Sequence, residues 1–293
     1  MNSMLVNIRD DDTNALTTKN DIVSAYSLFN DYKGITLGIV PFIHDSHFYM
    51  LNGSDCNTTK CKKLENYEAN LSVSEFGEYM KLSYFHENTE LIEFIDNNVF
   101  EIALHGVTHK FLKNGAEFYA IDVPEEDVKN AKRYLEELLK RDIFYFIPPS
   151  NAISENNLES LCSNKLSLLS SANPVFKNKI SKFVFLYGKY CKIEHLSQCL
   201  LKKYQKWNSS FRGVNIINSV TFGPGMNRED FIKKYERIAR FNGFISIATH
   251  YHALNRDEKH KQDLFYIVDY FINKYEGRMA TIQDISNYVN KKK

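Results

Sequence analysis

Two histidines four residues apart, His105 and His109, come directly after the apolar residues 102–104 of this 293-residue chain. Gly106 lies between them, and a glycine lets the backbone turn sharply out of a strand. If a helical turn begins after this glycine, both imidazole rings lie on one face and can bind one metal ion. The structural alternative is a histidine that caps the turn beside a second one exposed to solvent. The pair by itself indicates a metal site that needs a further ligand.

Three consecutive aspartates, Asp10, Asp11 and Asp12, follow the apolar residues 5–8. A solvated turn or a helix cap is the plain interpretation of such a run. Neighbouring carboxylates repel one another, however, and a bound cation relieves that repulsion. One aspartate and two histidines make a three-ligand set with open positions for water and substrate, as a catalytic divalent site requires. We expect one divalent ion, Zn²⁺ first, with Co²⁺, Ni²⁺, Fe²⁺ and Mn²⁺ as alternatives.

A second histidine pair, His250 and His252, follows the apolar residues 244–248. In a metal-dependent hydrolysis the ion lowers the pKa of bound water from 15.7 to roughly 7, a carboxylate takes the proton, and a histidine protonates the leaving group. We assign the acid to His250 because it lies closer to the end of the predicted strand. Tyr251 between the two is suited to stack on a sugar ring, with packing in the core as an equal alternative.

The elements that must position these residues alternate along the chain. Apolar, β-branched runs predict strands at residues 5–8, 35–40, 102–104, 143–147, 182–186, 214–222 and 244–248. Helical periodicity is clearest at residues 124–141 and recurs at residues 227–241, 257–275 and 281–289. Strands that alternate with helices predict an α/β fold with parallel strands, and about seven of them fit one closed or nearly closed barrel. The carboxyl ends of barrel strands carry functional groups, which is where the candidate residues fall.

The domain prediction is a single barrel over residues 1–293 with a polar, asparagine-rich insertion at about residues 48–83. The formal net charge of +1 gives no electrostatic argument for a nucleic acid or an acidic membrane as partner. No apolar run approaches the roughly 20 residues of a membrane span. The first residues lack the basic and apolar segments of a signal peptide, so we expect a cytoplasmic location. The sequence leaves the oligomeric state open.

Four stretches, "RDDD", "HGVTH", "FIPPSN" and "THYH", together resemble the motif series of the polysaccharide deacetylases, the NodB-homology carbohydrate esterases. They occur in the family's order over about residues 5–254, and "HGVTH" is the most specific of them. The resemblance is to a divergent branch of that superfamily. It implies a distorted (β/α) barrel of seven strands, in agreement with the strand count.

The resemblance also implies roles for individual residues. It makes Asp11 the general base and His250 the general acid, and it makes three residues the metal ligands, Asp12, His105 and His109. A shift of one residue would move the aspartate pair to Asp10 and Asp11, and the sequence leaves that open.

The chain departs from the family pattern in two ways. The family's acid-tryptophan motif is not found, because Trp207, the only tryptophan, has no suitable acid beside it. The third motif also usually begins with an arginine that orients the catalytic aspartate. Ile147 stands there in this chain. Arg9, at the end of the first predicted strand, is placed to supply a compensating cation. The residues that we expect to line the substrate site are Arg9, Pro149, Asn151, Tyr251 and His252.

The function implied by the resemblance is hydrolysis of an N-acetyl or related acyl amide on a sugar or glycan precursor. Two alternatives stay open. The first is a catalytically inactive glycan-binding protein on the same barrel. The second is a different metal-dependent hydrolase, acting on a phosphoester or a ring amide.

Overall fold

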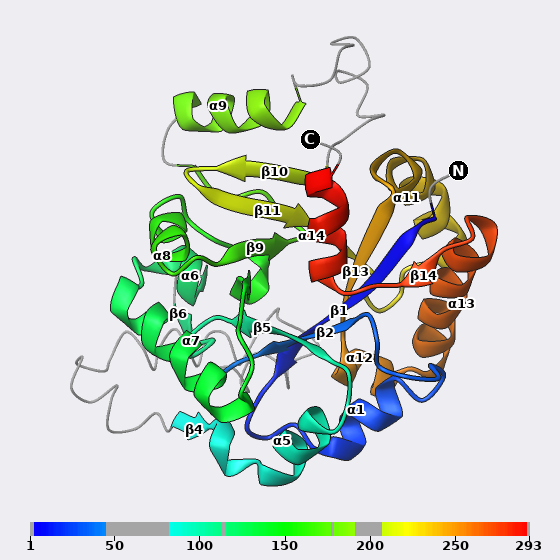
Figure 1. Ribbon diagram of the computed structural model, residues 1–293, viewed down its shortest axis with the longest axis horizontal. Helices are drawn as coiled ribbons and strands as arrows, with labels where there is room; N and C mark the ends of the chain where they lie inside the picture. Colours follow the sequence, from blue (N-terminus) through cyan, green and yellow to red (C-terminus); the bar gives the residue numbers. More distant parts are fainter. Residues whose placement is uncertain (1–2, 45–81, 113–114, 177–178, 191–206, 292–293) are drawn as a thin grey trace.

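We describe the protein from a computed structural model, which covers residues 3–44, 82–112, 115–176, 179–190 and 207–291. Within these residues a ten-stranded sheet forms the centre of the molecule (Figure 1). Its strands are β1 (Leu5–Thr13), β2 (Ile35–Ile39), β5 (Glu101–His105), β8 (Tyr145–Ile147), β9 (Ser167–Ser170), β10 (Asn208–Phe211), β11 (Val214–Asn218), β12 (Val220–Thr221), β13 (Phe244–His250) and β14 (Arg278–Met279).

The strand order in the sheet is β10-β11-β9-β8-β5-β2-β1-β13-β12, with β14 paired to β1. Every neighbouring pair is parallel except β10 and β11. Two short antiparallel pairs lie outside it, β3 (Phe42–His44) with β4 (Leu82–Tyr84) and β6 (Phe111–Leu112) with β7 (Gly115–Ala116). The predicted α/β fold with parallel strands is confirmed.

Helices surround the strands on the outside of the molecule (Figure 1). They are α1 (Lys19–Ala25), α5 (Thr89–Asp96), α6 (Glu117–Ala120), α7 (Glu125–Leu139), α8 (Asn157–Ser163), α9 (Lys179–Tyr190), α11 (Arg228–Asn242), α12 (Tyr251–Arg256), α13 (Glu258–Lys274) and α14 (Ile282–Lys291).

Helix α7 shows why the predicted helices form where they do. Its buried residues, spaced three or four apart along one stripe, are Val128, Ala131, Leu135 and Leu139. Helix α11 begins as its sequence indicates, because the Asn227 side chain accepts hydrogen bonds from the N–H groups of Glu229 and Asp230. Both helices therefore pack an apolar face inward and end near the predicted limits.

One stretch of chain links the two sides of the sheet, whose edge strands are β10 and β12. β11 lies next to the edge, paired with both β10 and β9, and only Ser219 separates it from β12, which pairs with β13. Among the described residues β11 and β12 are joined by the chain and not by a common ladder. This connection brings Ser219 beside β1, where its Oγ lies 3.4 Å from Nη1 of Arg9.

One predicted strand is wrong, and several short observed strands were not predicted, among them β9, β10 and β14 of the main sheet. Residues 182–186 lie in helix α9, where Phe185 is buried while Ile180 and Phe183 are 77% and 67% exposed. A short apolar run has no periodicity that separates a strand from one face of a helix. β9 forms the strand between β8 and β11. The sequence did not predict it, because two buried leucines between serines are too short a pattern to indicate a strand.

The predicted insertion at about residues 48–83 falls almost wholly outside the described residues, and the single-domain prediction stays a prediction. None of the helices in the described ranges has the length and apolar character needed to cross a membrane.

Candidate active site and metal centre

The three aspartates lie inside β1, not after it as the sequence had indicated. Strand β1 is buried along its whole length, and its register pairs Asp11 with His250 of β13. The pairing with β2 shifts between Asp10 and Thr13, and Asp12 has a φ of 75°. Such a bulge interrupts the alternation of side chains between the two faces of a strand. As a result Asp11 and Asp12 both serve the candidate site, although they are adjacent in sequence.

Asp12 receives the first histidine pair on one carboxylate oxygen. Its Oδ1 lies 3.0 Å from Nε2 of His105 and 3.1 Å from Nε2 of His109. The three side chains are buried, with at most 7% of any of them exposed. The two ring centroids are 4.7 Å apart. The structure thus brings together the three residues that the resemblance implied as ligands; their role as ligands stays a prediction.

The loop after β5 turns the two histidines together without the helical turn that the sequence suggested. Gly106 and His109 have left-handed backbones, with φ of 69° and 50°. The buried carboxylate of Glu117 accepts hydrogen bonds from the backbone N–H groups of Val107, Thr108 and His109, at 3.1 Å through Oε2 in each case. Sequence analysis missed Glu117, because an acid eight residues beyond a histidine belongs to no local pattern.

The hydrogen bonds of His105 indicate that a cation lies between its ring and the Asp12 carboxylate. Its Nδ1 lies 3.0 Å from the carbonyl oxygen of Ile147, and only a protonated Nδ1 can donate there. In a neutral ring Nε2 then directs a lone pair at the Asp12 carboxylate, 3.0 Å away. Two lone pairs at that distance repel, so a cation must lie between them, as a proton on the ring or as a metal ion.

The pKa values of the two groups point the same way. Burial alone would lower the pKa of His105, but its hydrogen bond to the Asp12 carboxylate and the charges of Asp11 and Asp12 raise it. Burial would raise the pKa of Asp12, yet hydrogen bonds from His105, His109 and His252 hold it well below its usual range. In tetrahedral coordination with bonds of about 2.0–2.1 Å the ligand atoms lie roughly 3.3 Å apart. The donors and their spacing therefore fit a divalent ion.

The second histidine pair faces the other oxygen of the same carboxylate. Nε2 of His250 lies 3.6 Å and Nε2 of His252 lies 3.4 Å from Asp12 Oδ2. These side chains are 32% and 22% exposed, so they form the solvent side of the cluster. The partial burial of His250 lowers its pKa, against the opposing charges of Asp12 and Asp11.

Arg9 contacts Asp11, as its position in the sequence suggested. Its Nη2 donates to Asp11 Oδ2 at 2.7 Å and to Asn151 Oδ1 at 2.6 Å, and its Nη1 lies 3.4 Å from Ser219 Oγ. The guanidinium is fully buried. Ile147 is buried too and serves the site through its backbone carbonyl, which holds His105. The cation beside Asp11 therefore comes from β1 and not from the strand that ends at Ile147.

Asp10 bonds to Tyr26 and to the backbone between the two histidines of the second pair. Its carboxylate accepts hydrogen bonds from the Tyr26 hydroxyl and, at 3.2 Å, from the Tyr251 backbone N–H. Burial raises the pKa of Asp10 well above its usual range, and the charges of Asp11 and Asp12 add to this, against those two hydrogen bonds. For these reasons we propose Asp11 and Asp12, and not Asp10 and Asp11, as the functional aspartate pair.

Three of the predicted substrate-binding residues have structural contacts within the protein. The Tyr251 hydroxyl lies 3.0 Å from Thr17 Oγ1, and its ring packs against the core. Pro149 is buried against Gly106, where an added Cβ would approach the proline Cγ to 2.6 Å. Asn151, in the same short turn (Pro149–Asn151), accepts from Arg9 and has a φ of 55°. Substrate contacts of these residues stay predictions.

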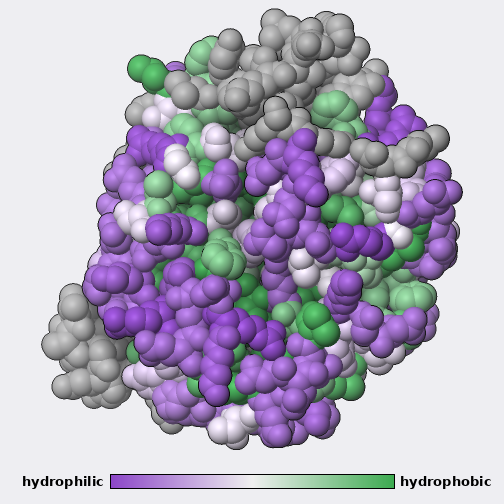
Figure 2. Space-filling view, in the orientation of Figure 1, coloured by the Kyte–Doolittle hydropathy of each residue, from purple (hydrophilic) through white to green (hydrophobic). Residues whose placement is uncertain are grey.

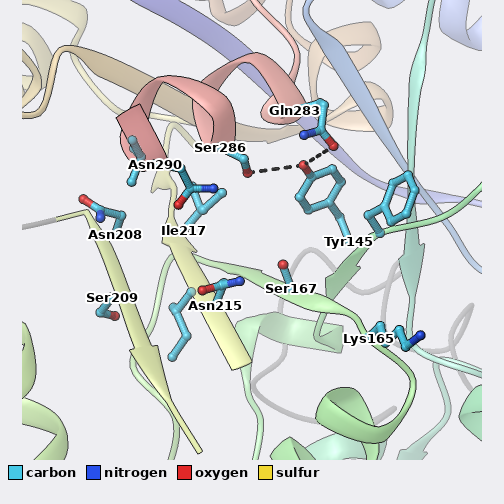
Figure 3. A pocket seen from close by; sticks show the side chains of 13 residues that line it. Tyr145, Lys165, Ser167, Asn208, Ser209, Asn215, Ile217, Gln283, Ser286 and Asn290 are labelled. Carbon is cyan, nitrogen blue, oxygen red and sulfur yellow. Dashed lines mark hydrogen bonds between the residues drawn. The ribbon is translucent and has the colours of Figure 1, made fainter. Parts of the chain in front are cut away.

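Figure 3 shows a separate pocket, which lies between α14 and strands of the main sheet. Its volume is about 220 Å³, and its walls include the first residues of β8 and β9 together with one side of α14. The Tyr145 hydroxyl bonds there to Gln283 and Ser286. None of the predicted site residues lines it. The candidate site is therefore the cluster at the carboxyl ends of β1, β5 and β13, as expected for parallel strands of this kind.

Comparison with known proteins bears on the fold. No protein-family model matches the chain, and no curated protein does. Among solved structures, a "putative polysaccharide deacetylase" from Mycobacterium smegmatis matches 99% of this chain and 92% of its own, with a TM-score of 0.51 and 11% identity.

Two other solved structures are aligned over similar lengths at lower TM-scores. The peptidoglycan deacetylase PdaC from Bacillus subtilis matches 99% of this chain and 93% of its own, with a TM-score of 0.44 and 9% identity. A family 4 acetyl xylan esterase from Clostridium thermocellum, in complex with a cobalt ion, matches 97% and 91% at a TM-score of 0.44 and 11% identity. The likeness to the Mycobacterium smegmatis structure shows that the chain has the same α/β fold as that protein.

Proposed function

We propose that this protein is a metal-dependent hydrolase of the polysaccharide deacetylase type, which removes an N-acetyl or related acyl group from a sugar or glycan precursor. The observation that carries the proposal is the convergence of two buried histidines on Asp12 beside a second, arginine-paired aspartate. A divalent ion held by Asp12, His105 and His109 supplies a Lewis acid for an acyl carbonyl and acidifies water. The fold and the order of the four motifs support the same superfamily.

Asp11 is the general base of this proposal. Arg9 occupies its Oδ2, and its Oδ1 is buried without a hydrogen-bond partner among the described residues. The free oxygen is thus available to accept a proton from water, while the arginine holds the carboxylate in one orientation. A base that is positioned in this way contributes about 10²- to 10⁴-fold to a hydrolysis rate.

His250 is the general acid. It lies opposite Asp11 in the register of β1 and β13, so base and acid come from adjacent strands. Its partly exposed ring borders solvent, where a leaving amine departs. Because its pKa is lowered, its imidazolium is a stronger proton donor and the charged form is less abundant at neutral pH.

The test combines metal content with an assay of acetate release from N-acetylated oligosaccharides. We expect the wild-type protein to bind zinc tightly and release acetate, and His105→Ala/His109→Ala to lose both. Asp11→Asn is the matched variant: it keeps the ligands and the fold, binds zinc, and loses about 10²-fold or more in rate. Circular dichroism shows whether each variant folds.

Two results would contradict the proposal. Failure of folded wild-type protein to bind any divalent ion would remove the metal mechanism. Tight binding without acetate release, and equal behaviour of wild type and Asp11→Asn on every acetylated sugar, would favour a glycan-binding protein or a hydrolase for another bond.

A further inference from the structure

The Asp12 carboxylate faces two histidine pairs, and the proposed mechanism uses only one pair as ligands. We propose that His250, His252 and Asp12 Oδ2 form a second, weaker site for a divalent cation, and that its occupation inhibits the enzyme. The inhibitory part depends on the proposed function, because it requires His250 to act as the acid. The binding part depends on the geometry alone.

The distances of the second group are close to those of the first. The Nε2 atoms of His250 and His252 lie 3.6 Å and 3.4 Å from Asp12 Oδ2, and all three ligand atoms lie within 4.8 Å of one another. Ligand atoms around a tetrahedral ion lie roughly 3.3 Å apart, so small ring movements suffice. A carboxylate whose two oxygens face different histidine pairs can bridge two ions about 3.5–4 Å apart, as in two-metal sites.

The local backbone places both histidines of the second pair on the Oδ2 side of the Asp12 carboxylate. His250 ends β13 in an extended conformation, with φ of −138° and ψ of 129°, and α12 begins at the next residue. The N–H of Tyr251 donates to Asp10 Oδ1 at 3.2 Å and fixes this change of direction. His252 thereby lies in the first turn of α12 with its ring 5.1 Å from that of His250, centroid to centroid. Asp10, which takes no part in the proposed chemistry, thus positions the second pair.

Burial and orientation make the second site the weaker one. The first pair is at most 4% exposed, and the carbonyl of Ile147 orients His105. The second pair is 32% and 22% exposed, and Nδ1 of His252 has no hydrogen-bond partner among the described residues. Loss of such an orienting bond costs about 10- to 100-fold in metal affinity. An ion in the first site also neutralises part of the charge of Asp12, which weakens the second site further.

The inhibition follows from the shared atom. Nε2 of His250 cannot hold a proton for the leaving amine and coordinate an ion at the same time. Activity should therefore rise as Zn²⁺ fills the first site and fall as Zn²⁺ fills the second.

The experiment is calorimetric titration of Zn²⁺ into metal-free full-length protein, with bound zinc counted after dialysis. We expect two steps in the wild type, separated by at least about tenfold in affinity. His252→Ala should remove the weak step and keep the tight one. His86→Ala is the matched control, because His86 is an exposed histidine that bonds to Tyr134, and this variant should keep both steps.

The outcomes separate this inference from the proposed function. A single tight step, unchanged in His252→Ala, overturns the second site and leaves the metal-dependent hydrolase intact. A weak step that His86→Ala removes identifies adventitious surface binding and also overturns it. Two steps with the expected response of His252→Ala, but no loss of wild-type activity over the weak step, keep the site and overturn its inhibitory role. The absence of any step contradicts the proposed function itself.

Discussion

Arg9 is the residue whose environment departs most from that of an ordinary surface cation. It is fully buried in β1, and Asp11, Asn151 and Ser219 surround its guanidinium. A buried ion pair adds little net stability over an apolar pair of the same size, but removal of one partner leaves an uncompensated charge. Arg9 and Asp11 are therefore expected to tolerate joint replacement better than single replacement.

A double-mutant cycle measures this coupling. We expect Arg9→Met to lower the free energy of unfolding by about 3–5 kcal/mol, because the Asp11 carboxylate stays buried without its cation. Arg9→Met/Asp11→Leu should recover a large part of that loss. Urea denaturation of the wild type, both single variants and the double variant gives the four values. Losses that simply add would show that the two residues do not form a coupled pair.

At the scale of elements, the loop after β5 determines how the first histidine pair meets Asp12. Gly106 has a positive φ of 69° and packs against Pro149, and the Glu117 carboxylate binds the N–H groups that follow. Backbone strain and close packing both restrict this position to glycine. The loop is therefore rigid for two separable reasons.

Three glycine variants separate these reasons. Gly223 has space for a Cβ and no positive φ, Gly225 has space but a φ of 76°, and Gly106 has a positive φ and a Cβ position 2.6 Å from Pro149 Cγ. Gly223→Ala should change the free energy of unfolding by less than about 1 kcal/mol, and Gly225→Ala should lower it by about 1–2 kcal/mol. Gly106→Ala should lower it by about 1–3 kcal/mol more than Gly225→Ala does.

Metal affinity gives the second measurement on the same three proteins. Only Gly106→Ala should weaken Zn²⁺ binding, because only this glycine adjoins the ligand loop. Equal affinity of all three variants would mean that the loop does not orient His105 and His109.

At the scale of the whole molecule, Glu101 and the candidate site lie at opposite ends of β5. The carboxylate of Glu101, at the start of β5, accepts hydrogen bonds from the N–H groups of Ile282 and Gln283 at 2.6 and 2.9 Å and from Thr36 Oγ1 at 2.7 Å. It thus caps α14 and holds this helix against the sheet.

The surface on the side seen in Figure 2 is mainly hydrophilic, with hydrophobic residues scattered among the polar ones.

Glu101→Ala tests the separation of the two ends. Three donors lose their acceptor, so we expect the free energy of unfolding to fall by about 1–3 kcal/mol. The Zn²⁺ stoichiometry and affinity of the folded protein should not change, because the proposed metal ligand His105 lies at the other end of β5. A change in affinity would show that the position of α14 is transmitted along β5 to His105.

The sequence by itself determined the class of fold and most of the elements. Alternating strand and helix patterns predicted parallel strands, and the cap at Asn227 and the stripe along α7 gave helix limits, because these signals are local. Local signals failed where tertiary contacts determine the structure. Residues 182–186 form part of a helix, although their short apolar run resembles a strand, and β9 was missed because two leucines are too short a pattern.

The sequence likewise predicted the candidate residues, but only the tertiary structure brings them together. The bulge in β1 gives Asp12 its direction. The register of β1 with β13 places His250 near its second oxygen, and the first turn of α12 places His252 there. Glu117 shapes the histidine loop from outside the motif. The roles of these groups are set by distances between strands that are far apart in the chain, and a linear pattern holds no information on such distances.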